Sequence, residues 1–325
     1  MILLYHRIAE GGSDPWGLSV SPADFAEHLS VLSRFGTPMG LQEFLRQRRD
    51  SNARGRAIVV TIDDGFANNL LQAKPILHKY GIPATVFVTA GMIGRPGEFW
   101  WDELERHLLN PGTLPSDLTL TIGGQRYHWA LEESAIYQEC DFRTHFGWRA
   151  WHTTCPSKRH ALYQTLYALL FRLEESARQA VLDELAEWAG GITRSARESH
   201  RLLTHDELAR MIDGGAVEVG AHSLTHTALG ALSPGQQWRE IQEGKALLED
   251  TIRKPVASFA FPFGRARDYS RETLALVRAA GFTCACTTIE DRVEAGADPF
   301  ELPRFTVHPK DRLQFSAWME GLLEQ

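Results

Sequence analysis

Short apolar runs that alternate with amphipathic helical patterns are the feature that most limits how this chain can fold. The clearest run, Ala57 to Ile62, is apolar and largely β-branched, which is typical of a strand buried on both faces. A helical pattern over residues 70–80 follows, and then a second strand-like run, Ala84 to Thr89. Two parallel strands joined by a helix form a right-handed βαβ unit. The chain is therefore predicted to build a parallel sheet or barrel.

The same alternation resumes in the last third of the sequence. It comprises helical patterns at 204–213, 233–251 and 270–280, and strand-like runs at 216–220, 258–261 and 283–288. A strand in the opening MILLYH and helices over 22–35 and 41–49 bring the count to six or seven units. The expected fold class is α/β, a distorted (β/α)7-type barrel.

Between the two barrel portions the regular alternation lapses. This segment contains LTLTIGGQRYHW, in which Gly123-Gly124 predicts the tight turn of a hairpin. It ends in a long helical pattern over residues 158–189. We expect one catalytic domain, 1–325, in which the mostly helical segment 95–200 is an insertion between barrel strands over the barrel mouth.

Composition excludes several classes of protein. At 325 residues and 43% hydrophobic composition the chain can bury a large core, and a net charge of -7 argues against a nucleic-acid partner. No apolar run reaches the ~18 residues of a membrane span, and MILLYHRIAE lacks the basic start of a signal peptide. Cys284 and Cys286 are expected to be buried thiols in a reducing compartment. These features predict a cytoplasmic protein.

Two polar motifs follow apolar strands directly. Asp63, Asp64 and Gly65 end the first strand, and His222 and His226 follow the strand at 216–220. Because the carboxyl ends of parallel strands meet at one edge, these side chains are expected to converge. Two imidazoles and a carboxylate can hold a divalent cation and leave positions open for water and substrate, which is typical of a catalytic metal site.

The motifs TIDDG (residues 61–65), HSLTH (222–226) and FPFG (261–264) resemble those of the polysaccharide deacetylase (NodB-homology) family, carbohydrate esterase family 4. The resemblance covers about residues 1–94 and 202–308. It implies metal-dependent hydrolysis of an N-acetyl, sometimes O-acetyl, group on a sugar. The metal would most readily be zinc, with cobalt, nickel or manganese as alternatives.

Carried over by position, the resemblance assigns a role to each motif residue. Asp64, His222 and His226 would hold the metal, and Asp63 would be the general base that takes a proton from the attacking water. The backbone N–H of Phe263, beside Pro262, would face the developing oxyanion. A backbone donor works equally well with Phe in place of the commoner Tyr.

A histidine general acid in a pattern like L-L-H normally lies on a late strand of this family, and the C-terminal end here lacks that pattern. The chain begins instead with Leu3, Leu4, Tyr5 and His6. Since the strands of a barrel form a closed ring, a strand from either end of the chain can occupy the same position in it. The motif is therefore predicted to be circularly permuted, with His6 as the acid and Leu4 near the acetyl methyl group. The alternative acid is His308.

Two further residues are candidates on weaker grounds. The arginine that usually orients the catalytic aspartate is replaced by Ala260, and Arg304 in ELPRFTV is expected either to replace it or to be a surface residue. The family's fourth motif, which contains Asp and Trp, is not evident. Trp101, in EFWWDEL, is expected either to contact substrate or to anchor the core of the insertion.

The function these features predict is removal of an acetyl group from an N-acetylated amino sugar, in a glycan or a sugar precursor, with release of acetate. A C–N hydrolase acting on a non-sugar amide and a sugar O-deacetylase are alternative enzymes. A glycan-binding pseudoenzyme is the alternative outside catalysis, and the intact metal and base residues count against it.

Overall fold

The structure of the protein is a computed structural model, and it describes residues 1–48, 55–191 and 195–324. The chain divides into two compact units. The first comprises Met1–Glu10, Leu18–Arg95 and Arg201–Gln325, and the second comprises Gly11–Gly17 and Pro96–His200.

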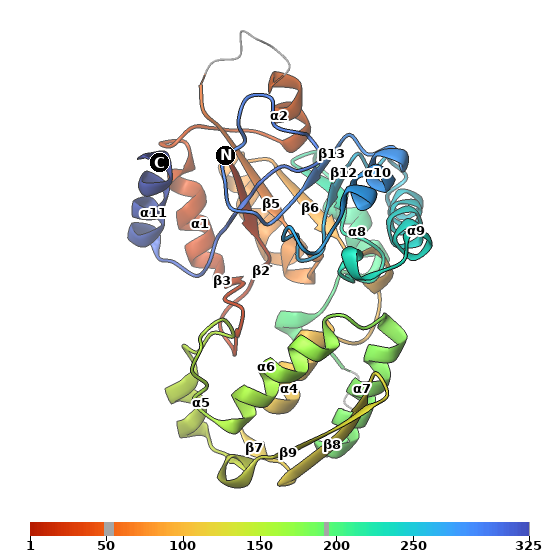
Figure 1. Ribbon diagram of the computed structural model, residues 1–325. Coiled ribbons are helices and arrows are strands. Elements are labelled where there is room, and N and C mark those ends of the chain that lie inside the picture. Colours follow the sequence, from red (N-terminus) through yellow and green to blue (C-terminus); the bar gives the residue numbers. More distant parts are fainter. Residues whose placement is uncertain (49–54, 192–194, 325) are drawn as a thin grey trace. The chain divides into compact units, whose positions relative to one another are not determined.

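A parallel sheet forms the centre of the first unit (Figure 1). Its main path runs in the order β13-β12-β11-β6-β5-β1-β14, and β4 pairs with β5. These strands are β1 (Ile2–Tyr5), β4 (Thr37–Pro38), β5 (Ala57–Ile62), β6 (Ala84–Val88), β11 (Val217–Ala221), β12 (Ser258–Ala260), β13 (Cys284–Cys286) and β14 (Phe305–Thr306). A separate short pair joins β2 (Arg7–Ile8) to β3 (Ser19–Val20).

One short segment links the two ends of this strand path. Leu302 forms a parallel bridge with Cys286 of β13, and the Thr287 N–H donates to the Leu302 carbonyl at 2.9 Å. A few residues later, Phe305 and Thr306 pair with β1. The first strand of the chain therefore lies beside the last, and the α/β barrel predicted from the sequence is confirmed in the curled parallel sheet.

Helices cover the outside of the sheet in the first unit. They are α1 (Pro22–Leu32), α3 (Lys74–Tyr80), α8 (His205–Met211), α9 (Pro234–Ile252), α10 (Arg271–Ala279) and α11 (Arg312–Glu324), with short 3-10 turns η2 (Ala90–Met92) and η5 (Leu229–Ala231). Helix α2 (Leu41–Arg48) instead packs its buried side chains against the inner face, in one cluster with Ile2 and Val59. In Figure 1, α1 lies beside α11 and α9 beside α10. The helix expected over 70–80 begins as a π-helix, η1 (Asn69–Ala73), because Pro75 has no N–H to continue an α-helical ladder.

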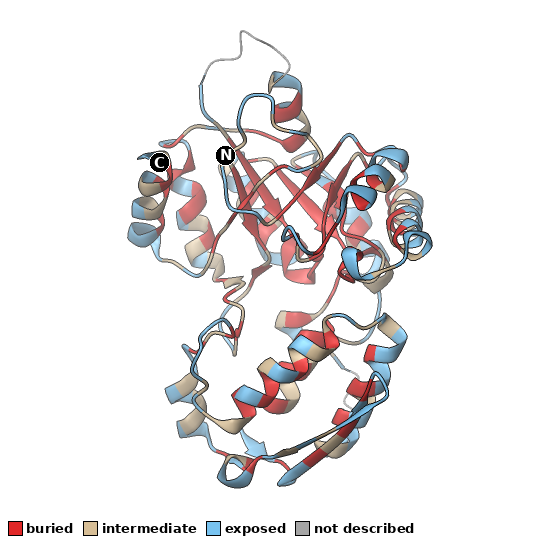
Figure 2. Cartoon of the chain, viewed as in Figure 1, coloured by how far each residue is buried: buried red, intermediate tan, exposed pale blue. Residues whose placement is uncertain are grey.

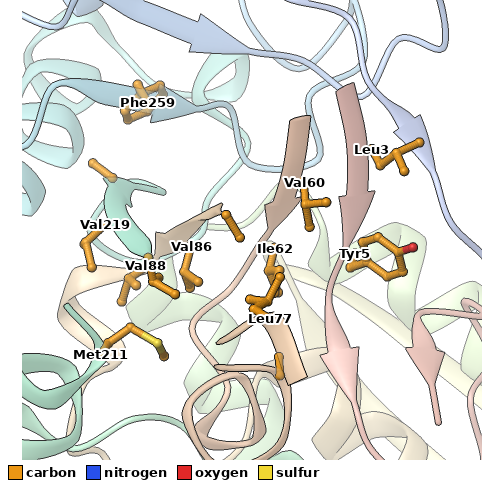
Figure 3. Packing of buried hydrophobic residues seen from close by; sticks show 14 of the residues in the cluster. Leu3, Tyr5, Val60, Ile62, Leu77, Val86, Val88, Met211, Val219 and Phe259 are labelled. Carbon is orange, nitrogen blue, oxygen red and sulfur yellow. The ribbon is translucent and has the colours of Figure 1, made fainter. Parts of the chain in front are cut away.

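Strand register separates an outer from an inner face. Leu3, Val60 and Ala84 lie in register and point to the helices, where they join the main apolar core shown in Figures 2 and 3. The next row, Leu4, Thr61 and Thr85, points into the barrel, because side chains alternate along a strand. The inner face thus combines apolar side chains with fully buried hydroxyl groups. The buried free thiols predicted in β13 are confirmed.

The second unit contains helices and small antiparallel sheets. Its elements are α4 (Trp100–Leu108), β7 (Gly112–Thr113), β8 (Asp117–Ile122), β9 (Gln125–Ala130), η3 (Glu132–Ala135), β10 (Ile136–Tyr137), α5 (Glu139–His145), α6 (Lys158–Leu170), α7 (Glu175–Trp188) and η4 (Glu198–His200). The hairpin with positive φ at Gly123 and Gly124 is confirmed. In the described part of the chain, no helix is both long and apolar enough to cross a membrane.

The single helix expected over 158–189 is wrong, because the chain breaks between α6 and α7. A straight helix over that span would be about 48 Å long. The two observed helices, α6 and α7, both pack against α4. A single straight helix of about 48 Å could not contact the short helix α4 along its whole length.

Candidate active site

The two adjacent carboxylates follow β5 and are both buried. The Asp63 side chain points into the barrel like that of Thr61, because residues two positions apart on a strand face the same side. Asp64 has a φ of 79°, a left-handed conformation that is uncommon outside glycine and that turns the chain out of the strand. Gly65 follows with a φ of 87°, and a Cβ there would lie 2.8 Å from Val88 Cγ1. This turn lets neighbouring carboxylates meet different partners.

Asp63 is paired with Arg304 inside the barrel. Arg304 Nη1 donates to Oδ1 and Nη2 donates to Oδ2, each at 2.7 Å. The guanidinium is fully buried and also donates to the Thr287 carbonyl at 2.8 Å and to Thr61 Oγ1 at 3.2 Å. Burial alone would raise the pKa of Asp63, but the charges of Arg304 and His222 hold it below its usual value. Asp63 is therefore an anion at neutral pH.

Asp64 faces two imidazoles instead. Its Oδ1 lies 3.5 Å from His222 Nε2 and 3.3 Å from His226 Nε2. The three ligand atoms lie within 4.8 Å of one another, and all three residues are buried. A cation between these atoms would gain two nitrogen ligands and one oxygen ligand.

The protonation states of this group suit a divalent metal ion. Burial raises the pKa of Asp64, and Oδ1 makes no hydrogen bond with any described residue. Burial also lowers the pKa of His222 to about 4, although Asp63 opposes the shift, so this imidazole is neutral at pH 7. A buried carboxylate oxygen without a donor beside a neutral imidazole is costly by itself, and a metal ion would satisfy both. The residues therefore fit the metal that the sequence predicts.

The loop after β11 aims the two histidines. His222 Nδ1 donates to the Ala260 carbonyl at 2.8 Å, which leaves Nε2 directed toward Asp64. Ser223 and His226 have φ values of 59° and 57°, and the His226 N–H donates to Ser223 Oγ at 3.0 Å. This compact left-handed turn brings residues four apart in the sequence to a ring separation of 4.8 Å.

His6 directly follows β1 at the same end of the barrel. Burial lowers its pKa, while the charges of Asp64 and Asp63 oppose that shift. Nδ1 is buried and forms no hydrogen bond within the described residues. His308 follows β14, which pairs with β1, so both candidate acids leave neighbouring strands at one edge. The choice between them stays a prediction.

The residues expected at the substrate lie around this edge. Leu4 is fully buried in the inner row beside Thr61. Pro262 is buried, and Phe263 has a φ of 60° in the turn after β12. The Phe263 ring packs edge-on against His226 with 4.7 Å between ring centroids. The third motif thus contacts the second.

Trp101 belongs to the second unit, where it is only 7% exposed. Its ring stacks on Phe99 with 4.5 Å between centroids and meets Trp100 edge-on at 5.5 Å. This packing is that of a core anchor, the alternative to substrate contact. The predicted sugar contact of Trp101 remains a prediction.

Sequence reasoning missed two asparagines that bind the backbone of His6 and Ile8. Asn69 Nδ2 donates to the His6 carbonyl at 2.8 Å, and the Ile8 N–H donates to Asn68 Oδ1 at 3.0 Å. These contacts tie the end of β1 to the chain that follows the carboxylate pair. The available signal was the sequence NN just beyond TIDDG, since paired amides beside a strand end can bind exposed backbone groups.

Comparison with known proteins bears on this arrangement. A family model described as "Polysaccharide deacetylase" matches residues 50–112 and 163–285, more than half of the chain. The Bacillus subtilis (strain 168) protein named "Putative polysaccharide deacetylase YxkH" is 21% identical over 326 residues, which cover 99% of this chain and 76% of that protein.

Solved structures share the fold. The Streptococcus pyogenes deacetylase PplD, determined in complex with acetate, matches with a TM-score of 0.57 and 16% identity over 98% of this chain and 96% of that one. IcaB from Ammonifex degensii matches with a TM-score of 0.58 and 18% identity over the same shares of the two chains.

Proposed function

Because the chain belongs to the polysaccharide deacetylase family, we propose that it hydrolyses the acetyl group of an N-acetylated amino sugar, in a glycan or a sugar precursor. The observation that carries this proposal is the pair of unlike carboxylates, Asp63 bound to Arg304 and Asp64 facing two imidazoles. The proposal treats the chain as one catalytic domain in which 95–200 is an insertion.

Asp64, His222 and His226 would hold one divalent metal ion, with zinc first and cobalt, nickel or manganese as alternatives. When bound, such an ion lowers the pKa of water and polarises a carbonyl group. The buried Oδ1 of Asp64, which has no hydrogen bond from a described residue and faces both imidazoles, supports this assignment.

Asp63 serves as the general base. Its lowered pKa keeps it ionised at neutral pH, and the two hydrogen bonds from Arg304 fix the orientation of its carboxylate. Its Oδ2 lies 3.8 Å from His222 Nε2, which supports action at the same site as the metal ligands.

His6 serves as the general acid, because an amine leaves an amide readily only when it receives a proton. The buried Nδ1 without a hydrogen bond to described residues supports this role. Leu4 and Pro262 would contact the acetyl methyl group, and the Phe263 N–H would donate to the carbonyl oxygen.

The test of the reaction is acetate release. Protein stripped by a chelator and then restored with Zn²⁺, Co²⁺ or Ni²⁺ should release acetate from N-acetylglucosamine oligomers or N-acetylated sugar nucleotides, and Asp64→Asn should not. The absence of metal-dependent acetate release from every N-acetyl sugar would overturn the proposal. Release from O-acetyl sugars alone would indicate an O-deacetylase.

The test of the acid is a pair of matched variants. His6→Ala should lower amide hydrolysis by about 10²–10⁴-fold and affect hydrolysis of an aryl acetate much less, because a phenolate leaves without a proton. His308→Ala should retain both activities. The reverse result would assign the acid to His308.

A further inference from the structure

The segment between the two histidine ligands is held from α9. Glu240 Oε2 accepts hydrogen bonds from the Leu224 N–H at 3.0 Å and the Thr225 N–H at 2.9 Å. Its other oxygen accepts the Thr225 hydroxyl at 2.6 Å. One side chain therefore binds two consecutive backbone donors and a hydroxyl group inside HSLTH.

The same face of α9 approaches this loop closely. Gly244 lies one turn beyond Glu240, and a Cβ there would lie 3.0 Å from the Ser223 carbonyl carbon and oxygen. From η2, the Ala90 N–H donates to the Ser223 carbonyl at 3.1 Å and the Gly91 N–H to the Leu224 carbonyl at 2.8 Å. The loop is thus bound through its carbonyl groups by η2 and through its amides by Glu240.

Such external contacts are needed because the loop is strained. Ser223 and His226 both occupy the left-handed region, which costs roughly 1–2 kcal/mol for each residue with a Cβ. A loop that lost its bonds to Glu240 would relax toward ordinary backbone angles and separate the two imidazoles.

We propose that Glu240 is a positioning residue for the metal site: it holds the loop between His222 and His226 so that both imidazoles converge on Asp64 before metal binds. This inference rests on the proposed metal site. Glu240 acts through the backbone of Leu224 and Thr225, and it needs no contact with metal or substrate.

The experiment measures Co²⁺ binding to the full-length, chelator-stripped protein, by competition with a chromophoric chelator and by the visible absorption of the bound ion. Glu240→Ala should weaken Co²⁺ binding by about 10–100-fold and alter the absorption bands that report coordination geometry. Glu240→Gln keeps one carbonyl acceptor, so it should lose only about fivefold. If the negative charge alone mattered, the Gln and Ala variants would bind equally weakly.

Glu243→Ala is the matched control. Glu243 lies on the same helix, its side chain is 60% exposed, and its Oε1 lies 3.8 Å from Arg239 Nε. Removing this carboxylate should leave Co²⁺ affinity and absorption unchanged. Should Glu240→Ala fail to fold, Thr225→Val removes the hydroxyl contact alone and should weaken Co²⁺ binding by a few-fold.

Asp64→Asn separates the two possible failures. If the unaltered protein does not bind Co²⁺, or if Asp64→Asn binds it equally well, the proposed metal site itself is wrong. If that site exists but Glu240→Ala matches Glu243→Ala in affinity and spectrum, only the positioning role of Glu240 is overturned.

Discussion

Asp63 and Asp64 are identical side chains on consecutive residues, and their surroundings are opposite. Asp63 accepts two hydrogen bonds from Arg304 and has a lowered pKa. Asp64 is equally buried, but its Oδ1 receives no hydrogen bond from the described chain and its pKa is raised by burial. The partner supplied by the rest of the barrel, not the residue type, therefore decides in which direction the pKa of each carboxylate moves.

The difference arises from one backbone turn. Asp63 follows the alternation of side chains along β5 and points into the barrel. Arg304, which lies in the segment that links β13 to β14, contacts it there. Asp64 has left the strand through its positive φ and meets the histidine loop that follows β11. The two carboxylates therefore contact side chains from different parts of the barrel.

The largest expected effect is on the rate. Asp63→Asn should lower kcat by about 10²–10⁴-fold while Co²⁺ still binds, because the ligand set is intact. Asp64→Asn should lose Co²⁺ binding together with activity. Measurements of kcat and Co²⁺ titrations of both variants check this. If Asp63→Asn also failed to bind Co²⁺, the assignment of Asp63 as base and Asp64 as metal ligand would be wrong.

Arg304→Met should give the largest loss of stability. It leaves a buried carboxylate without its ion pair, which typically costs about 3–5 kcal/mol of unfolding free energy. Urea unfolding at pH 7 measures it, with Arg239→Met as the control because that side chain is 68% exposed and its partner Glu243 is also exposed. Equal stability of the two variants would mean that the Asp63 ion pair contributes little.

Metal binding should stabilise the folded protein only when Asp64 is present as a ligand. At a free ion concentration 100 times its dissociation constant, the folded state should gain about 2.7 kcal/mol. Thermal unfolding of Asp63→Asn should show this gain, whereas Asp64→Asn should show none. A full metal-induced shift in Asp64→Asn would place the cation elsewhere.

The smallest effect concerns pH in the metal-free protein. Since the folded pKa of Asp64 lies above its unfolded value, its contribution to stability is present below the unfolded pKa and is lost as pH rises through the folded pKa. In chelator at pH 7, Asp64→Asn should therefore be more stable than the unaltered protein by about 1–3 kcal/mol.

That difference should shrink as pH falls toward 4. Asp63→Asn should behave in the opposite way, because the lowered folded pKa of Asp63 contributes stability above its unfolded pKa that is lost as pH falls. Unfolding free energies from about pH 2 to 7 check both signs, because the lowered pKa of Asp63 places its loss of stability below the usual value of 3.8. A metal-free Asp64→Asn protein that is less stable at pH 7 would contradict the raised pKa.

Local patterns in the sequence determined the longer strands, most helices and the three motifs, because periodicity, capping residues and turn glycines act over a few neighbouring positions. They did not indicate the two-residue strands β2, β3 and β4. They identified the carboxylate pair and the histidine pair as strand-end groups that would converge. They did not reveal the break between α6 and α7, which depends on both helices packing against α4.

Only the tertiary structure decided what each carboxylate faces. Arg304 reaches Asp63 across 241 sequence positions, and Asn69 holds His6 across 63. No local pattern contains such contacts, because strand register and the link between β13 and β14 create them. The sequence contains two adjacent aspartates, and closure of the barrel makes their environments unlike.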